Sequence, residues 1–179
     1  FQGCGGNSEP PGSDPSGDNS TSASIPSNAP VPMGTILSEV EDSGVKVTFF
    51  LAEGENGKHW LRATFSPLEI GYHVYSKDLP KDGIDGIGRP TLLELSENSA
   101  ITDIGELTAD KKIHNLMSPL NADGFPVYPD GPVTLSLPFT MQPDTNGTVD
   151  IMVKITYMAC TKTSCNPPVE GKAVKLTLK

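Results

Sequence analysis

Two cysteines near the C-terminal end are the residues best suited to chemistry in this sequence. Cys160 and Cys165 are separated by four residues, and Pro167 and Pro168 follow shortly after the second cysteine. A thiolate of another protein can attack a disulfide and pass through a mixed disulfide, so a close pair of thiols can carry two electrons. The same pair can also act as a plain covalent staple.

The segments on either side of the cysteines predict a β-hairpin. Apolar and polar residues alternate through residues 148–157 and again through residues 174–179, as in half-buried strands. Two such runs joined by a short polar connection favour an antiparallel pair, with Cys160 closing one arm and Cys165 near the start of the other. Opposed residues in such a pair have Cα atoms about 4.5 to 5.5 Å apart, a separation that suits a disulfide.

Two interpretations of this disulfide stay open on the residues alone. A structural bridge is common in exported β-domains, but a bridge that closes so short a loop removes little entropy from the unfolded chain. Pro167 and Pro168 lack backbone N–H groups and keep the connection off the β-ladder. A loop that stands clear of the sheet is accessible to a second protein, which makes a redox-active pair a serious competitor.

The N-terminal segment differs in composition from the rest of the chain. Residues 1–3 look like the remnant of a cleavable tag, and residues 4–32 consist mainly of Ser, Gly, Pro, Asn and Asp, a composition that predicts a flexible tether. Cys4 resembles the lipidated first residue of a mature bacterial lipoprotein, the alternative being a free thiol. The sequence contains three cysteines, so a lipidated Cys4 and a Cys160–Cys165 pair would leave no unpaired thiol.

Length and charge restrict the remaining possibilities. A chain of 179 residues allows one domain plus a tail, which we place at residues 33–179 and 4–32. The net charge of -9 argues against nucleic acid as a partner, because phosphates would be repelled. The sequence lacks an apolar run of about eighteen residues, so we expect membrane contact through a lipid anchor only.

Short alternating runs after residue 33 predict an all-β domain. Seven to nine strands punctuated by turns fit an antiparallel β-sandwich of immunoglobulin-like type. Outside the cysteine hairpin, we expect strands at residues 45–51, 59–65, 72–76, 91–95, 101–107 and 133–141. Residues 77–90 and 115–130 are expected to be long loops.

Three stretches resemble the N-terminal periplasmic domain of the thiol:disulfide interchange protein DsbD, and the resemblance spans roughly residues 45–179. The first runs from Ile155 to Pro168 and contains an aromatic residue, two residues, Cys160, four residues, Cys165, one residue and two prolines. The second is Gly71-Tyr72-His73-Val74-Tyr75, with His73 where the family often has an aromatic residue. The third is Asp123-Gly124-Phe125-Pro126-Val127-Tyr128, at the place of the family's cap segment.

The resemblance implies a redox function in the bacterial cell envelope, without a metal or an organic cofactor. It implies that the domain takes electrons from a thioredoxin-like or membrane-embedded exchange protein and passes them to an exported acceptor. Cys165 would then engage the partner, and Cys160 would resolve the mixed disulfide. Because no such donor domain follows in this chain, we expect the donor to be a separate polypeptide.

The resemblance also implies roles for the residues around the sulfurs. Phe125 would act as a lid that shields the disulfide until a partner displaces it, and Asp123 would assist proton movement. Tyr75 and His73 would flank the sulfurs, although ordinary packing on a sheet face explains them as well.

Two other classes of function remain open. A lipid-tethered β-sandwich that binds a partner, with a purely structural disulfide, fits the tether and the fold equally well. A copper carrier built on Met158, the cysteines and a histidine fits less well, because a blue-copper site expects a His and a Met just after the Cys. The sequence contains no nucleophile elbow, HExxH motif or phosphate-binding loop, so it gives no support to hydrolase chemistry.

Overall fold

The computed structural model describes residues 33–95, 100–142 and 147–179. The predicted tag remnant at residues 1–3, the tether at residues 4–32 and the lipidation site Cys4 lie outside the described residues. These three expectations therefore stay predictions.

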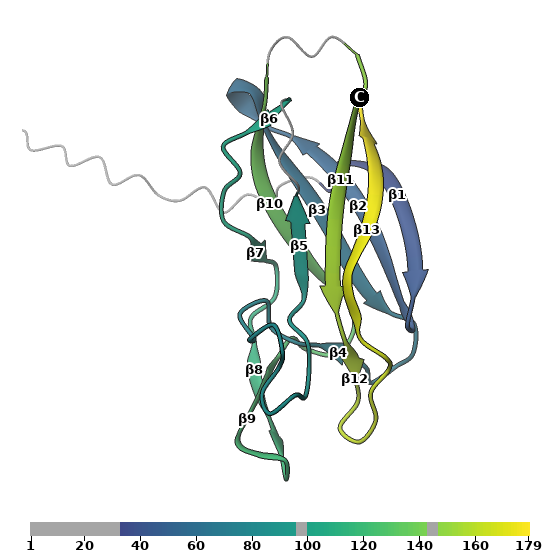
Figure 1. The fold of residues 1–179 in the computed structure, drawn as a ribbon, viewed down its shortest axis with the longest axis vertical. Helices are drawn as coiled ribbons and strands as arrows, with labels where there is room; N and C mark the ends of the chain where they lie inside the picture. The colour runs from purple at the N-terminus through teal and green to yellow at the C-terminus, as the bar shows by residue number, and fades with distance from the viewer. Residues whose placement is uncertain (1–32, 96–99, 143–146) are drawn as a thin grey trace, which may run out of the picture. The chain divides into compact units, whose positions relative to one another are not determined.

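Two antiparallel sheets form a β-sandwich (Figure 1), which confirms the predicted all-β class. The first sheet has the order β1-β2-β3-β10-β6, with β7 also paired to β10. Its strands are β1 (Thr35–Asp42), β2 (Val45–Glu53), β3 (Lys58–Pro67), β6 (Ile101–Thr102), β7 (Thr108–Ala109) and β10 (Val133–Met141). The second sheet has the order β13-β11-β5. Its strands are β5 (Leu92–Leu95), β11 (Val149–Tyr157) and β13 (Val169–Leu178).

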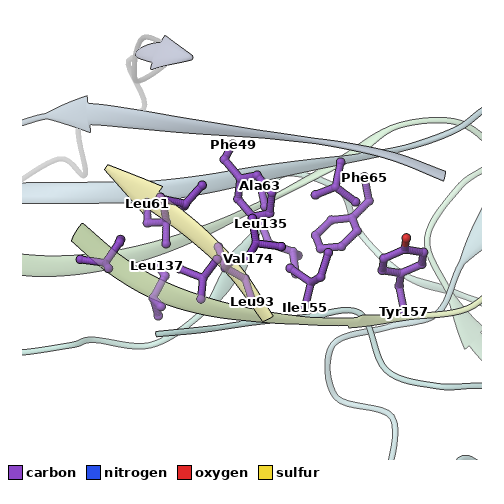
Figure 2. Packing of buried hydrophobic residues seen from close by; sticks show 14 of the residues in the cluster. Phe49, Leu61, Ala63, Phe65, Leu93, Leu135, Leu137, Ile155, Tyr157 and Val174 are labelled. Atoms are coloured by element: carbon purple, nitrogen blue, oxygen red, sulfur yellow. The ribbon is translucent and has the colours of Figure 1, made fainter. Parts of the chain in front are cut away.

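The main core lies between the inner faces of these two sheets. Figure 2 shows Phe49, Leu61 and Phe65 of the first sheet among Ile155 and Tyr157 of the second, and all five are buried. The rings of Phe65 and Tyr157 meet edge to face, with centroids 5.5 Å apart. In β10, and in β11 as far as Ile155, every second side chain points inward, so sequence period and burial agree. Burial of these apolar side chains between the two sheets stabilises the folded sandwich, because it removes their surface from water.

Several expected strands are shorter than predicted, and others were missed. The region 101–107 contributes only β6, because Asp103 adopts a left-handed backbone (φ 50°) and leaves the ladder, and β7 begins after this region at Thr108. The region 72–76 contributes only β4 (His73–Val74) as a regular strand. β1 was not predicted, because it lies at the edge of its sheet with mostly exposed or half-buried side chains and so lacks clear alternation.

The prediction of a long loop at residues 115–130 was wrong. The chain there forms an antiparallel hairpin of β8 (His114–Ser118) and β9 (Asn121–Val127). A register shift after Leu116 and the proline at position 126 interrupt the period-2 pattern by which the strands would have been recognised.

The predicted cysteine hairpin is present, but its tip leaves the main sheet. β11 and β13 pair from Val149 opposite Leu178 to Tyr157 opposite Val169. Beyond Tyr157 the chain turns into β12 (Ala159–Cys160), which pairs with β4 instead. Figure 1 shows β4, β12 and the β8–β9 hairpin at the end of the sandwich away from the C-terminus. This end carries the cysteines.

Candidate functional site

Cys160 and Cys165 are joined in a disulfide, and the two residues differ in burial. The Cα atoms lie 4.0 Å apart, and the two residues form an isolated antiparallel bridge. Cys160 is 1% exposed, whereas Cys165 is an exposed residue on the loop that follows β12. A thiolate arriving from solvent therefore finds Cys165 accessible and Cys160 covered.

The loop between the cysteines is a hydrogen-bonded turn. The backbone N–H of Thr161 donates to the carbonyl of Ser164 at 2.7 Å. The Thr161 hydroxyl accepts the N–H groups of Thr163 and Ser164 at 3.2 and 3.0 Å. The exposed residue Cys165 thus follows a hydrogen-bonded turn that lies outside the main sheets.

Asn166 fixes the arm that carries Cys165. Its backbone N–H donates to the carbonyl of Ala159 at 2.9 Å, and its side-chain amide donates to the carbonyl of Ser43 at 3.1 Å. Gly44 follows in the same turn with φ +71°, and a Cβ there would lie 2.4 Å from the Asn166 amide nitrogen. The turn between β1 and β2 therefore needs glycine at this position to accommodate Asn166.

A second hydrophobic cluster, separate from the main core, covers Cys160. Its buried members are Tyr75, Leu79, Phe125, Val127 and Cys160 itself. The rings of Tyr75 and Phe125 meet edge to face with centroids 6.0 Å apart. The cluster draws on the β8–β9 hairpin and on the segment that follows β4, so these two parts form a cap over the buried sulfur. We call it the cap cluster.

Tyr75 is the member of the cap cluster that contacts the disulfide with a polar group. Its hydroxyl donates a hydrogen bond to Cys160 Sγ at 3.4 Å. Burial raises the pKa of the Tyr75 phenol, so the hydroxyl keeps its proton at neutral pH and acts as a donor. The backbone of Tyr75 is held by a bridge to Val127 and by the Thr91 hydroxyl, which donates to its carbonyl at 2.6 Å. Gly88 leaves room for the ring, because a Cβ at Gly88 would lie 2.8 Å from it.

His73 lies directly opposite Cys160 in the β4–β12 pair and is 2% exposed. Its Nδ1 is 3.4 Å from a carboxylate oxygen of Asp130, and its ring stands edge-on to Tyr75 with centroids 6.2 Å apart. Burial lowers the pKa of the His73 imidazole, and the nearby His114 lowers it further, although Asp130 acts in the opposite direction. The imidazole is therefore neutral at pH 7.

The structure thus brings five of the residues expected at the site together and leaves one outside. Cys160, Cys165, Tyr75, His73 and Phe125 lie around the disulfide in one continuous set of contacts. Asp123 is exposed on the β8–β9 hairpin, where its backbone N–H donates to Asn121 at 3.2 Å. No contact of the described residues joins Asp123 to the sulfurs, and its role in proton movement stays a prediction.

Sequence reasoning missed Asp130 and Asn166. Asp130 contacts His73 although the two residues are 57 positions apart in the chain, and no local sequence pattern indicates such a contact. Asn166 sits between Cys165 and Pro167, inside the signature itself, and an amide there suggests a side-chain hydrogen bond to a nearby turn.

A cleft of about 570 Å³ opens beside the disulfide loop. Residues lining it include His73, His114, Leu116, Asp130 and Lys162. Within residues 33–95, 100–142 and 147–179, no group of three or more His, Cys, Asp or Glu side chains is arranged to hold a metal ion. Among the same residues, no helix has the length and hydropathy needed to cross a bilayer.

Comparisons with known proteins leave the family open. No family model matches the chain, and no curated protein matches it significantly. Among solved structures, the N-terminal periplasmic domain of ScsB from Proteus mirabilis matches with a TM-score of 0.49 and 10% identity, over 81% of this chain and 51% of that chain. The chain thus spans about half the length of that protein. The GAE domain of GGA2p from Saccharomyces cerevisiae matches with a TM-score of 0.39 and 11% identity, over 83% of this chain and 98% of that one. Both TM-scores lie below 0.5, so neither likeness supports an inference about function.

Proposed function

We propose that this domain exchanges its Cys160–Cys165 disulfide with the thiols of other proteins in the bacterial cell envelope. The observation that carries the proposal is the asymmetry of the pair. One cysteine is an exposed residue on a loop, while the other lies under a cap cluster that is separate from the main core. An exchange-competent disulfide needs one sulfur that a partner can attack and a second that leaves and returns under control of the protein.

Reduction of the domain then proceeds in two steps. A thiolate of a thioredoxin-like or membrane-embedded partner attacks Cys165 Sγ, the Cys160–Cys165 bond breaks, and Cys160 leaves as a thiolate that takes up a proton. A second thiolate of the partner then attacks the partner sulfur that is bonded to Cys165, and Cys165 is released. The domain gains two electrons and two protons, and the partner becomes a disulfide.

Delivery of the electrons to an exported acceptor reverses these roles. The Cys165 thiolate attacks the acceptor's disulfide, and one acceptor sulfur leaves and is protonated. Cys160 then loses its proton and attacks Cys165 Sγ, which re-forms the internal bridge and releases the acceptor as a dithiol. Phe125 acts as a lid during this cycle, because it packs on Tyr75 over the buried sulfur and belongs to a hairpin outside the main sheets.

Tyr75→Phe tests whether the hydroxyl assists the sulfur. The phenol donates to Cys160 Sγ, and a hydrogen bond to a charged acceptor is about twice as strong as one to a neutral acceptor, so it favours the thiolate. We expect the substitution to raise the pKa of the Cys160 thiol and to slow closure of the internal disulfide about tenfold. The pKa is measured by thiolate absorbance in a Cys165→Ser background, and Tyr128→Phe serves as the matched control. An unchanged thiol pKa would show that the contact is only packing.

The proposed function itself is tested with the wild-type protein. We expect the bridge to form in air and to be reduced by a thioredoxin-like protein at neutral pH. Its reduction potential should lie above about −300 mV, because structural disulfides in secreted proteins typically have potentials below that value. Reduction is followed by alkylation of the freed thiols and mass spectrometry. A bridge that resists reduction under these conditions would favour the binding-module alternative, in which the disulfide only fixes the hydrogen-bonded loop at Thr161.

The cellular setting of the proposal rests on the sequence. Lipid attachment at Cys4 would hold the domain at a membrane surface of the envelope, where exported proteins and membrane-embedded exchange proteins meet. Mass spectrometry of the protein expressed in a bacterium behind a lipoprotein export signal should detect acyl chains at Cys4, and an unmodified Cys4 would contradict the lipid anchor.

A further inference from the structure

The imidazole of His73 carries a ring nitrogen that the oxidised protein leaves without a partner. Nε2 of His73 is buried and makes no hydrogen bond, although the residue belongs to the pair of strands that holds Cys160. Buried polar atoms nearly always have a partner, and an unpaired one costs free energy. An unpaired acceptor on the residue opposite Cys160 therefore calls for a second state of the protein in which it is satisfied.

The surroundings of His73 define what kind of group could satisfy Nε2. Because Nδ1 faces the Asp130 carboxylate, Nδ1 carries the proton and donates, which leaves Nε2 with a free lone pair. The other titratable or charged groups near His73 are Tyr75, His114 and, on the cleft beside it, Lys162. The Tyr75 hydroxyl already donates to Cys160 Sγ. Nε2 thus requires a hydrogen-bond donor.

Reduction of the disulfide creates such a donor at the adjacent position. Cys160 and His73 are directly opposed in the antiparallel pair, an arrangement in which side chains share one face and Cβ atoms lie about 4.5 to 5.5 Å apart. The sulfur of the disulfide has no hydrogen to offer. When the bridge takes up two electrons and two protons from a dithiol, Cys160 becomes a thiol with an S–H group, which is a donor.

We propose that His73 is a positioning residue whose Nε2 accepts the hydrogen of the Cys160 thiol in the reduced domain and thereby favours the reduced form. In that state Cys160 Sγ accepts from Tyr75 and donates to His73, so both polar neighbours of the sulfur are paired. The inference rests on the proposed function for its use, since it makes the domain a better acceptor of electrons from its donor. The equilibrium between the Cys160–Cys165 disulfide and its dithiol form can be measured with any thiol reductant.

The test measures the equilibrium between disulfide and dithiol in glutathione buffers at pH 7. We expect His73→Phe, which keeps a ring but removes the acceptor, to shift the equilibrium about tenfold towards the disulfide, or about 30 mV for this two-electron couple. His73→Gln places an acceptor at a similar reach and should restore most of the wild-type value. His114→Phe, the matched control from the same cleft, should leave the equilibrium unchanged.

Other outcomes would overturn the inference. An equilibrium unaffected by His73→Phe, or shifted equally by His114→Phe, would show that the imidazole does not pair with the thiol. Should His73→Phe fail to fold, the ¹⁵N resonance of Nε2 in the wild-type protein decides the matter, because it must move on reduction towards the value of a hydrogen-bonded acceptor. If a thioredoxin-like protein fails to reduce the wild type while the glutathione equilibrium still depends on His73, the proposed function fails and this inference stands.

Discussion

Cys165→Ser is expected to abolish disulfide exchange, whereas Cys160→Ser is expected to trap a partner covalently. Without Cys165, the remaining thiol of Cys160 lies in the cap cluster at 1% exposure, where a partner's disulfide reaches it only when the cap is open, and the domain has no second sulfur to complete the exchange. Without Cys160, the exposed Cys165 can still enter a mixed disulfide, and the domain has no second sulfur to resolve it, so only the partner's second thiol can undo the complex. Incubation with an oxidised thioredoxin-like protein followed by a non-reducing gel distinguishes the two variants.

The control for this experiment is folding. In the chain-entropy description, a bridge that closes so short a loop contributes about 2 kcal/mol to the free energy of unfolding. The main core between the two sheets is separate from the cap cluster, so both variants should keep the wild-type circular dichroism spectrum. Trapping by Cys165→Ser alone would reverse the assigned roles, and an unfolded Cys165→Ser would show that the bridge is a staple.

The sandwich was predictable because its central strands carry an uninterrupted period of two. In β10 and β11 every inward position is apolar, from Val133 to Phe139 and from Val149 to Tyr157, so burial could be inferred from the sequence alone. Recognition of strands from alternating apolar and polar residues failed for the strands that lack this alternation. β1 is an edge strand with little burial, and β8–β9 is a hairpin whose register shifts after Leu116.

The candidate site was predictable in part, for a similar reason. His73 and Tyr75 are two positions apart and were expected on one face, and both lie beside Cys160. The signature around the cysteines located the disulfide. Asp130 could not be assigned, because its contact with His73 depends on the return of the chain after β9. The split of the apolar residues into a main core and a cap cluster is likewise a property of the fold.

Phe125→Ala is expected to uncover Cys160 while the sandwich stays folded. Phe125 packs edge to face on Tyr75 in the cap cluster, and replacing a buried Phe by Ala costs about 3 to 5 kcal/mol. Because this cluster is separate from the main core, the cost should fall on closure of the cap, so the population of open cap should rise by a factor on the order of a hundred or more. The rate of alkylation of Cys160 by iodoacetamide in a Cys165→Ser background measures that population.

Two matched variants separate a local effect from a global one. Met117→Ala removes an exposed side chain from the same hairpin and should leave the alkylation rate unchanged, because Met117 is 69% exposed. Phe65→Ala removes a fully buried ring from the main core and should lower the free energy of unfolding of the whole sandwich by about 3 to 5 kcal/mol. If Phe125→Ala lowered the unfolding midpoint as much as Phe65→Ala does and left Cys160 protected below that midpoint, the cap would be part of the sandwich. It could then not open for a partner, because opening would require unfolding of the whole domain.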